Sequence, residues 1–154
     1  CSASKDFLRK TVDEFRQRKL GVAACLITPL EKSIVGSFLF FWYNAWVIIV
    51  QRIAPHAAGC AILCTSDVYR SCGGFRPYIK MYEEHDFVMR ARKHGKFRVL
   101  YSRRMRTSLR RFERDGVFLT LSRLFLSWML RLVSGELHKD VFGYFVVGDT
   151  RKKD

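Results

Sequence analysis

The sequence predicts an α/β fold, because short apolar runs alternate along the chain with segments that show helical periodicity. Three apolar runs have the length of buried strands, at residues 22–28, 60–65 and 97–101. Helical patterns lie before and between them, at residues 4–19, 34–50 and 84–93. With 154 residues, 49% of them hydrophobic, the chain is long enough for one domain with a hydrophobic core.

The N-terminal helix is expected to begin at Ser4, whose hydroxyl suits a helix N-cap, and to run to about Lys19 before Gly21 ends it. The basic residues on one face of this helix are expected to be solvated. Its apolar face comprises Phe7, Leu8, Val12 and Phe15. The strand at residues 22–28 follows, and Pro29 is expected to end it because proline lacks a backbone donor.

The most apolar stretch is Ile34–Val50. As a helix it would be about 26 Å long, which is shorter than the ~30 Å hydrocarbon core of a bilayer. A narrow polar stripe runs along it, formed by Ser33, Ser37, Asn44 and Gln51. The pattern leaves open a core helix and a helix in a membrane interface, and a membrane-spanning helix is the least favoured alternative.

Residues 56–90 combine several signals. After the strand at 60–65, Ser66 and Asp67 suit the start of a short helix, and Gly73 and Gly74 are expected to end it. Glycine at these positions permits positive φ and a close approach of the backbone to a ligand. Phe75 and Pro77 then lead into an acidic group at the start of the helix 84–93, which Gly95 ends; this group comprises Glu83, Glu84 and Asp86.

Two extended runs, 97–101 and 105–109, precede a second amphipathic helix at 117–133, and a last strand is expected at 142–147. Polar residues recur along the helix at three- and four-residue steps, namely Thr120, Arg123, Ser127, Arg131 and Ser134. Arginines beside an aromatic-rich apolar face favour contact with an anionic membrane surface, and packing against the protein's own domain is the alternative.

The chain is strongly basic, with 28 Lys and Arg against 14 Asp and Glu, which gives a net charge of +14. Such a charge attracts nucleic acids, phosphorylated substrates or anionic membranes, and the charge alone does not choose among them. No helix-turn-helix pattern, RNA-binding aromatic signature or zinc-ligand spacing supports nucleic acid as a partner. The five cysteines lack C-x-x-C spacing and are expected to be buried free thiols in a reducing compartment.

The order of a strand, a short helix, Gly73-Gly74-Phe75 and then Glu83-Glu84-His85-Asp86 resembles the acceptor side of a family 2 glycosyltransferase. The resemblance implies a partial GT-A, Rossmann-like domain in which residues 1–112 form the acceptor-side half. Residues 113–154 would then form a C-terminal amphipathic helix, at a membrane interface, and a tail. The nucleotide-binding half and its D-x-D motif would lie outside this chain, so these 154 residues alone are expected to be inactive.

The same resemblance implies the site residues. Glu84 stands where the family usually has Asp and is the expected general base, with Asp86 as the second catalytic carboxylate. The expected substrate-binding residues of this segment are Gly73, Gly74, Phe75 and Glu83. The run Ser108 to Phe112 resembles the Q-x-x-R-W segment of processive members, and it makes Arg110 and Arg111 candidates for holding phosphate oxygens. Ser108 replaces the glutamine, which argues against a processive enzyme.

The resemblance implies an inverting transfer from a nucleotide-sugar donor to a hydroxyl or polyprenyl-phosphate acceptor. The enzyme would be peripheral at the cytoplasmic face of an anionic membrane. It would use Mg²⁺ or Mn²⁺ in the full-length protein, with the metal ligands mainly outside this chain. Nucleic acid is not expected as a partner. The alternatives are a basic nucleic-acid-binding module and a non-catalytic membrane-associated module.

Overall fold

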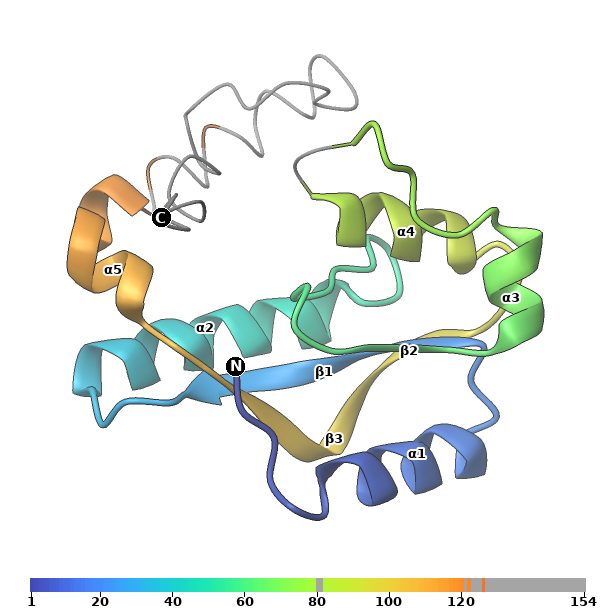
Figure 1. Ribbon diagram of the computed structural model, residues 1–154, viewed down its shortest axis with the longest axis horizontal. Coiled ribbons are helices and arrows are strands. Elements are labelled where there is room, and N and C mark those ends of the chain that lie inside the picture. The colour runs from blue at the N-terminus through green and yellow to red at the C-terminus, as the bar shows by residue number, and fades with distance from the viewer. Residues whose placement is uncertain (80–81, 121, 123–125, 127–154) are drawn as a thin grey trace, which may run out of the picture.

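The computed structural model describes residues 1–79, 82–120, 122 and 126, and these form an α/β domain around a three-stranded sheet (Figure 1). The strand order is β2-β1-β3, with β1 antiparallel to β2 and parallel to β3. The α/β class predicted from the sequence is therefore confirmed. In chain order the elements are α1 (Phe7–Gln17), β1 (Val22–Pro29), α2 (Ile34–Val50), β2 (Ile62–Cys64), α3 (Ser66–Ser71), α4 (Glu83–Ala91), β3 (Phe97–Thr107) and α5 (Arg110–Asp115).

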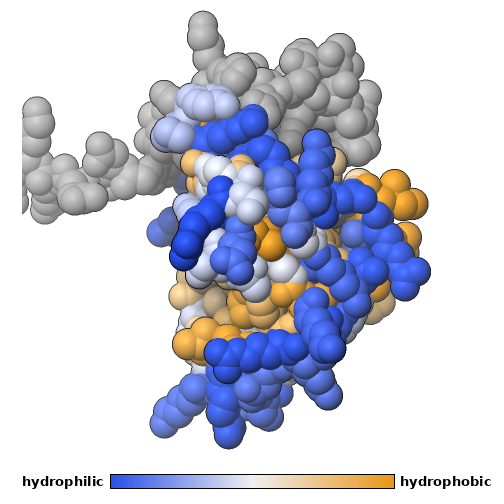
Figure 2. Space-filling model, turned by 90° about the vertical axis from the view of Figure 1, so that its right-hand side faces the viewer, coloured by the Kyte–Doolittle hydropathy of each residue, from blue (hydrophilic) through white to orange (hydrophobic). Residues whose placement is uncertain are grey.

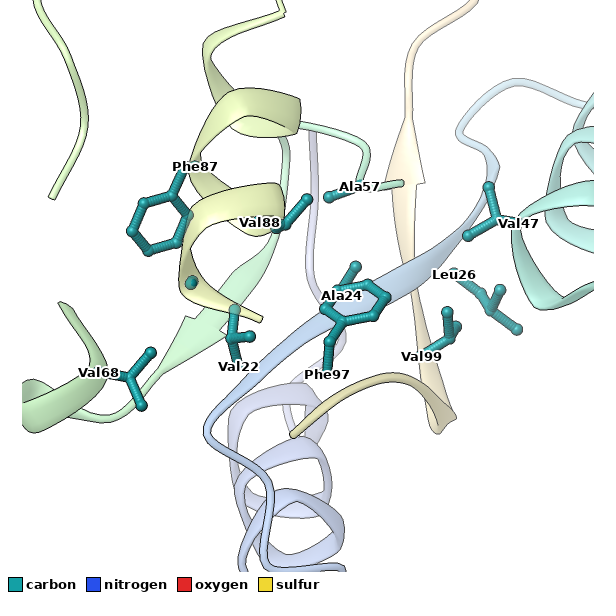
Figure 3. Close-up of a cluster of buried hydrophobic side chains, with 11 residues drawn as sticks. Val22, Ala24, Leu26, Val47, Ala57, Val68, Phe87, Val88, Phe97 and Val99 are labelled. Atoms are coloured by element: carbon teal, nitrogen blue, oxygen red, sulfur yellow. The ribbon is translucent and has the colours of Figure 1, made fainter. Parts of the chain in front are cut away.

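The central strand β1 is buried from Val22 to Ile27 and sends alternate side chains into two clusters. Val22, Ala24 and Leu26 pack against side chains from α2, α3, α4 and β3, as the close-up in Figure 3 shows. The other side chains of β1 pack with Phe7 and Phe15 of α1. Because both faces of β1 are covered, its sequence is a continuous apolar run with no polar alternation.

The extended structure expected at 97–101 is confirmed, but the second run expected at 105–109 is not a separate element, because β3 is one strand that continues to Thr107 and leaves residues 108 and 109 outside it. Its pairing with β1 shifts register after Leu100, and Arg104 is the next paired residue. Side chains of α1 bind the unpaired residues between them. The Glu14 carboxylate accepts hydrogen bonds from the amides of Tyr101, at 3.0 Å to Oε2, and Ser102, at 2.8 Å. Sequence periodicity gives no sign of such a bulge, since it depends on this partner in α1.

Several expected element ends are also wrong. The N-cap of α1 is Asp6, and Ser4 lies before it, donating from its hydroxyl to the Asp6 carboxylate. The helix ends at Gln17, before Gly21, and Lys19 takes up the left-handed turn with φ +50°. Gly21 packs instead against the backbone of Gly95, where an added Cβ would lie 2.6 Å from the Gly95 Cα. Backbone-to-backbone packing explains the glycine, and a local pattern cannot reveal it.

The strand predicted at 60–65 is shorter in the structure, where β2 comprises only Ile62–Cys64. Thr65 caps α3, since its hydroxyl accepts from the amide of Val68, and Ser66 is the first helical residue. The acidic helix begins at Glu83 and ends at Ala91, close to the predicted 84–93. All five cysteines are free thiols; Cys25 is buried, Cys1 is exposed and the other three are partly buried.

Two residues of the polar stripe of α2, Asn44 and Gln51, face the sheet, whereas Ser37 is exposed. Asn44 is buried, donates to the carbonyl of Ile27 at 2.7 Å and accepts from the Ile27 amide at 3.1 Å. Ile27 lies beyond the part of β1 that pairs with β2, so the Asn44 amide satisfies backbone groups that lack a strand partner there. Gln51 likewise accepts from the amide of Val99 in β3. The helix is therefore a core helix on its inner side only.

No helix in the described part of the chain combines the length and apolar character that a membrane span requires. Of the helix expected at 117–133, residues 117–120 are helical, and nearly all the rest lies outside the described residues. The strand expected at 142–147 lies outside them entirely.

Candidate functional site

The glycine turn after α3 has the geometry that the sequence predicts. Gly73 and Gly74 both have positive φ, at +74° and +63°. A Cβ on Gly73 would meet nothing, whereas one on Gly74 would lie 2.8 Å from the ring and hydroxyl of Tyr69. Glycine is therefore required at Gly74 by both its backbone conformation and its contact, and at Gly73 by conformation alone.

A buried ion pair fastens this turn to α4. Asp86 is 5% exposed, and its Oδ2 accepts from Arg90 Nε at 2.9 Å and Nη2 at 2.6 Å. The same guanidinium donates to the carbonyl of Gly74 at 2.7 Å and to the carbonyl of Cys72. Arg76 lies 3.7 Å from the other oxygen of Asp86. Arg90 thus joins the acidic helix to the glycine turn, and the sequence alone gives no signal for its role.

Asp86 was expected to be a catalytic carboxylate. It contacts Arg76 and Arg90, and through Arg90 it positions the glycine turn. A catalytic role for Asp86 stays a prediction. Glu83 lies partly exposed in the first turn of α4.

Phe75, which follows the glycines, lines a pocket. Its ring stacks on Phe87 of α4 with centroids 4.4 Å apart and an interplanar angle of 19°. The pocket is open, has a volume of about 440 Å³ and lies between β2 and these rings. Its lining comprises Gly59, Cys60, Ala61, Ile62, Cys64, Tyr69, Phe75 and Phe87. The molecular face over α3 and α4 carries mainly hydrophilic side chains around smaller apolar areas (Figure 2).

The two cysteines of the pocket have thiol pKa values above the ordinary range. Burial raises the pKa of the Cys64 thiol to about 11, and burial likewise raises the pKa of Cys60. Both thiols therefore stay protonated at neutral pH and form small apolar parts of the wall.

Glu84 lies beside this pocket. It is partly buried, and a Cβ added to the pocket residue Gly59 would lie 3.5 Å from the Glu84 carboxyl carbon and 3.7 Å from its Oε2. Gly59 therefore leaves room for this carboxylate. Burial raises the pKa of Tyr43 in α2, and the charge of Glu84 raises it further. Glu84 thus points at the loop before β2, and α2 supplies a neighbouring hydroxyl.

Two histidines meet next to Glu84. The rings of His56 and His85 lie 4.4 Å apart, and Trp46 of α2 contacts His56 at 4.8 Å. His85 belongs to the acidic segment that the sequence singles out, whereas His56 and Tyr43 were not identified from the sequence. In residues 1–79 and 82–120, no group of three or more His, Cys, Asp or Glu side chains is arranged to hold a metal ion. The expected Mg²⁺ or Mn²⁺ concerns the longer protein, and its ligands stay a prediction.

The basic segment, residues 108–112, lies at the N-terminal end of α2, away from Glu84 and the two histidines. Leu109, just before α5, packs on Gly36, whereas the His56–His85 pair packs on Trp46, ten residues or about 15 Å further along the helix. Figure 1 shows α5 and α4 at opposite ends of α2. Arg110 is exposed on α5, and the side chain of Arg111 lies outside the described residues. The structure therefore does not bring Arg110 next to Glu84.

Local contacts hold the start of the basic segment. Ser108 donates to Glu31 Oε1 at 2.7 Å and the Leu109 amide donates to Oε2 at 2.9 Å, and these hydrogen bonds lower the pKa of Glu31. Arg103 is ion-paired with Asp6, and Arg114 with Asp115. Arg103 and Arg114 therefore serve the fold, whereas Arg110 is exposed and is a candidate for binding an anion.

Comparison with known proteins gives no match. No family model matches the chain, and no curated protein or solved structure is significantly similar to it.

Proposed function

We propose that the chain is the acceptor-side part of a GT-A glycosyltransferase that transfers a sugar from a nucleotide-sugar donor. The observation that carries this proposal is the grouping around the open pocket. The glycine turn presents Phe75 to the pocket, and Glu84 lies against Gly59 at its edge. A carboxylate beside a partly apolar pocket suits a sugar, whose ring faces pack on aromatic groups while its hydroxyls form hydrogen bonds.

The reaction would proceed by direct displacement. An acceptor hydroxyl oxygen attacks the anomeric carbon, the bond from that carbon to the diphosphate oxygen breaks, and the configuration inverts. Glu84 takes the hydroxyl proton as the new bond forms, and the nucleoside diphosphate leaves with the electron pair. With a polyprenyl-phosphate acceptor, the attacking oxygen is already ionised and Glu84 positions the acceptor without deprotonating it.

The donor side of the domain is proposed to lie in a longer protein. Within the described residues, no strand pairs with the outer edge of β2, whose three residues are partly exposed. Such an edge can accept a further strand. A divalent metal bound on that side would neutralise the leaving diphosphate. Arg110 and Arg111 are proposed to bind phosphate oxygens, and the enzyme is proposed to work peripherally at the cytoplasmic face of a membrane.

The test is a sugar-transfer assay on the longer protein, with labelled nucleotide sugars and polyprenyl phosphate or a lipid-linked sugar as acceptor. Glu84→Gln should lower the rate by about 10²- to 10⁴-fold with a hydroxyl acceptor if Glu84 is the base. The matched control, Asp13→Asn, changes an exposed carboxylate of α1 and should leave the rate unchanged. Equal rates for wild type and Glu84→Gln with both acceptor classes would refute the assignment of Glu84.

A further inference from the structure

The outward face of α2 is apolar along its whole length. Ile34 is 92% exposed, Ile49 is 76% exposed, and Trp42 between them is 58% exposed. No charged residue occurs from Ile34 to Val50. The exposed large side chains of this face are Ile34, Val35, Phe38, Phe41, Trp42, Trp46 and Ile49. A contiguous apolar surface of this kind marks an interaction site.

The orientation of α2 is fixed by its polar residues. Asn44 forms two hydrogen bonds with the backbone of Ile27, and Gln51 forms one with the backbone of Val99. Rotating the helix to bury its aromatic face would break these bonds and leave buried backbone groups without partners. Among the described residues, the apolar face of α2 is therefore held outward, away from the sheet.

The basic residues at the two ends of α2 indicate what kind of partner covers its apolar face. Lys32 is exposed before the first turn of α2, and Arg52 is exposed just after its last turn. Arg92 adds a second cation at the C-terminal end of α2, since it donates to the carbonyls of Arg52 and Ile53. The net charge of +14 opposes face-to-face pairing of two copies and favours an anionic surface.

The carboxylates near the N-terminal end of α2 do not prevent binding to an anionic surface. Glu31 accepts hydrogen bonds from the hydroxyl of Ser108 and from the amide of Leu109. Glu113 of α5 lies on the groove that Val35 and Phe112 line. Neither residue interrupts the apolar face itself, which consists of α2 side chains.

We propose that α2 binds the surface of an anionic phospholipid bilayer and lies parallel to it, with its outer face at the boundary between headgroups and acyl chains. Tryptophan is enriched at this depth, and Trp42 and Trp46 both belong to the face. The cations at the two helix ends lie level with the phosphates. The inference deepens the proposed peripheral position at a membrane but does not depend on glycosyl transfer, because it rests on α2, its flanking charges and the net charge of the chain.

The test measures partitioning of the 154-residue chain onto vesicles of phosphatidylcholine with and without phosphatidylglycerol. Trp42→Gln/Ile49→Gln should lower the partition coefficient on anionic vesicles by at least about tenfold, because two large apolar side chains leave the lipid. Leu8→Gln is the matched control, since Leu8 is 68% exposed on α1, in the layer on the other side of the sheet. It should bind within about twofold of wild type, because one exposed apolar group away from α2 contributes little.

All three positions are exposed, so these variants keep the core, and circular dichroism confirms it. A second measurement uses Trp128→Phe, which leaves Trp42 and Trp46 as the remaining tryptophans. Lipids brominated on the acyl chain should quench its fluorescence. Unchanged partitioning of the double variant, or vesicle binding without quenching, would overturn the proposal. So would a wild-type dimer that the double variant converts to monomer without any vesicle binding, because a second copy would then be the occupant.

Discussion

Replacing Arg90 by Met tests whether the buried ion pair holds the candidate site together. The side chains of Asp86 and Arg90 are 6% and 16% exposed, so water screens the pair only weakly. Without the guanidinium, the Asp86 carboxylate keeps Arg76 at 3.7 Å but loses two short hydrogen bonds. The carbonyls of Cys72 and Gly74 lose their donors as well.

The magnitude follows from this geometry. Breaking a buried pair from one side costs about 3–5 kcal/mol of unfolding free energy. For a chain of this size, about 2–4 °C of melting temperature corresponds to each kcal/mol, so Arg90→Met should melt about 6–20 °C below wild type. Urea unfolding and thermal melting, both followed by circular dichroism, measure the two quantities. Arg9→Met, on the exposed face of α1, is the matched control and should change stability by less than about 0.5 kcal/mol.

A double variant separates the pair from its surroundings. Asp86→Leu/Arg90→Met removes the isolated buried charge, so it should be more stable than Arg90→Met alone although the two carbonyls still lack donors. A loss below about 1 kcal/mol for Arg90→Met would refute the reasoning. Additive losses from the two single substitutions would also refute it, because they would show that the groups are not coupled.

Two further predictions concern the glycine turn and the bulge of β3. Gly73→Ala should lower the free energy of unfolding by about 1–2 kcal/mol, because alanine is strained at the left-handed φ of this position. Gly74→Ala should lower it by about 1–3 kcal/mol more, because its Cβ would also lie 2.8 Å from Tyr69. Equal losses for the two variants in urea unfolding would contradict this reasoning. For Glu14, burial alone would raise the pKa, but hydrogen bonds from Ser102, Tyr101 and Arg18 outweigh it, so the folded pKa lies below the usual 4.5. Its contribution to stability is therefore complete above about pH 4.5 and is lost as the pH falls through the folded pKa. The difference in unfolding free energy between wild type and Glu14→Gln should shrink between about pH 7 and about pH 3, and a constant difference would contradict the reasoning.

Local patterns in the sequence predicted the elements around the candidate site well. The bounds of α2 agree with the predicted Ile34–Val50, because its capping serine and its continuous apolar run both act locally. The positive φ of Gly73 and Gly74 and the acidic start of α4 follow from neighbouring residues in the same way. The partners of these elements were less predictable. Arg90, His56 and Tyr43 entered the site only in three dimensions, since each comes from a different element.

The sequence by itself determined that this chain is an α/β domain, where most of its helices lie, and that Ile34–Val50 has a polar stripe on an apolar helix. Periodicity fixes which side chains share a face, but it does not fix which face meets the sheet. The tertiary structure decided that for α2, because the edge of β1 that faces β2 has no strand partner at Ile27, and Asn44 supplies both a donor and an acceptor there. The aromatic face turned outward as a consequence, and backbone hydrogen bonding, acting over 17 residues of sequence separation, outweighed burial of that apolar face.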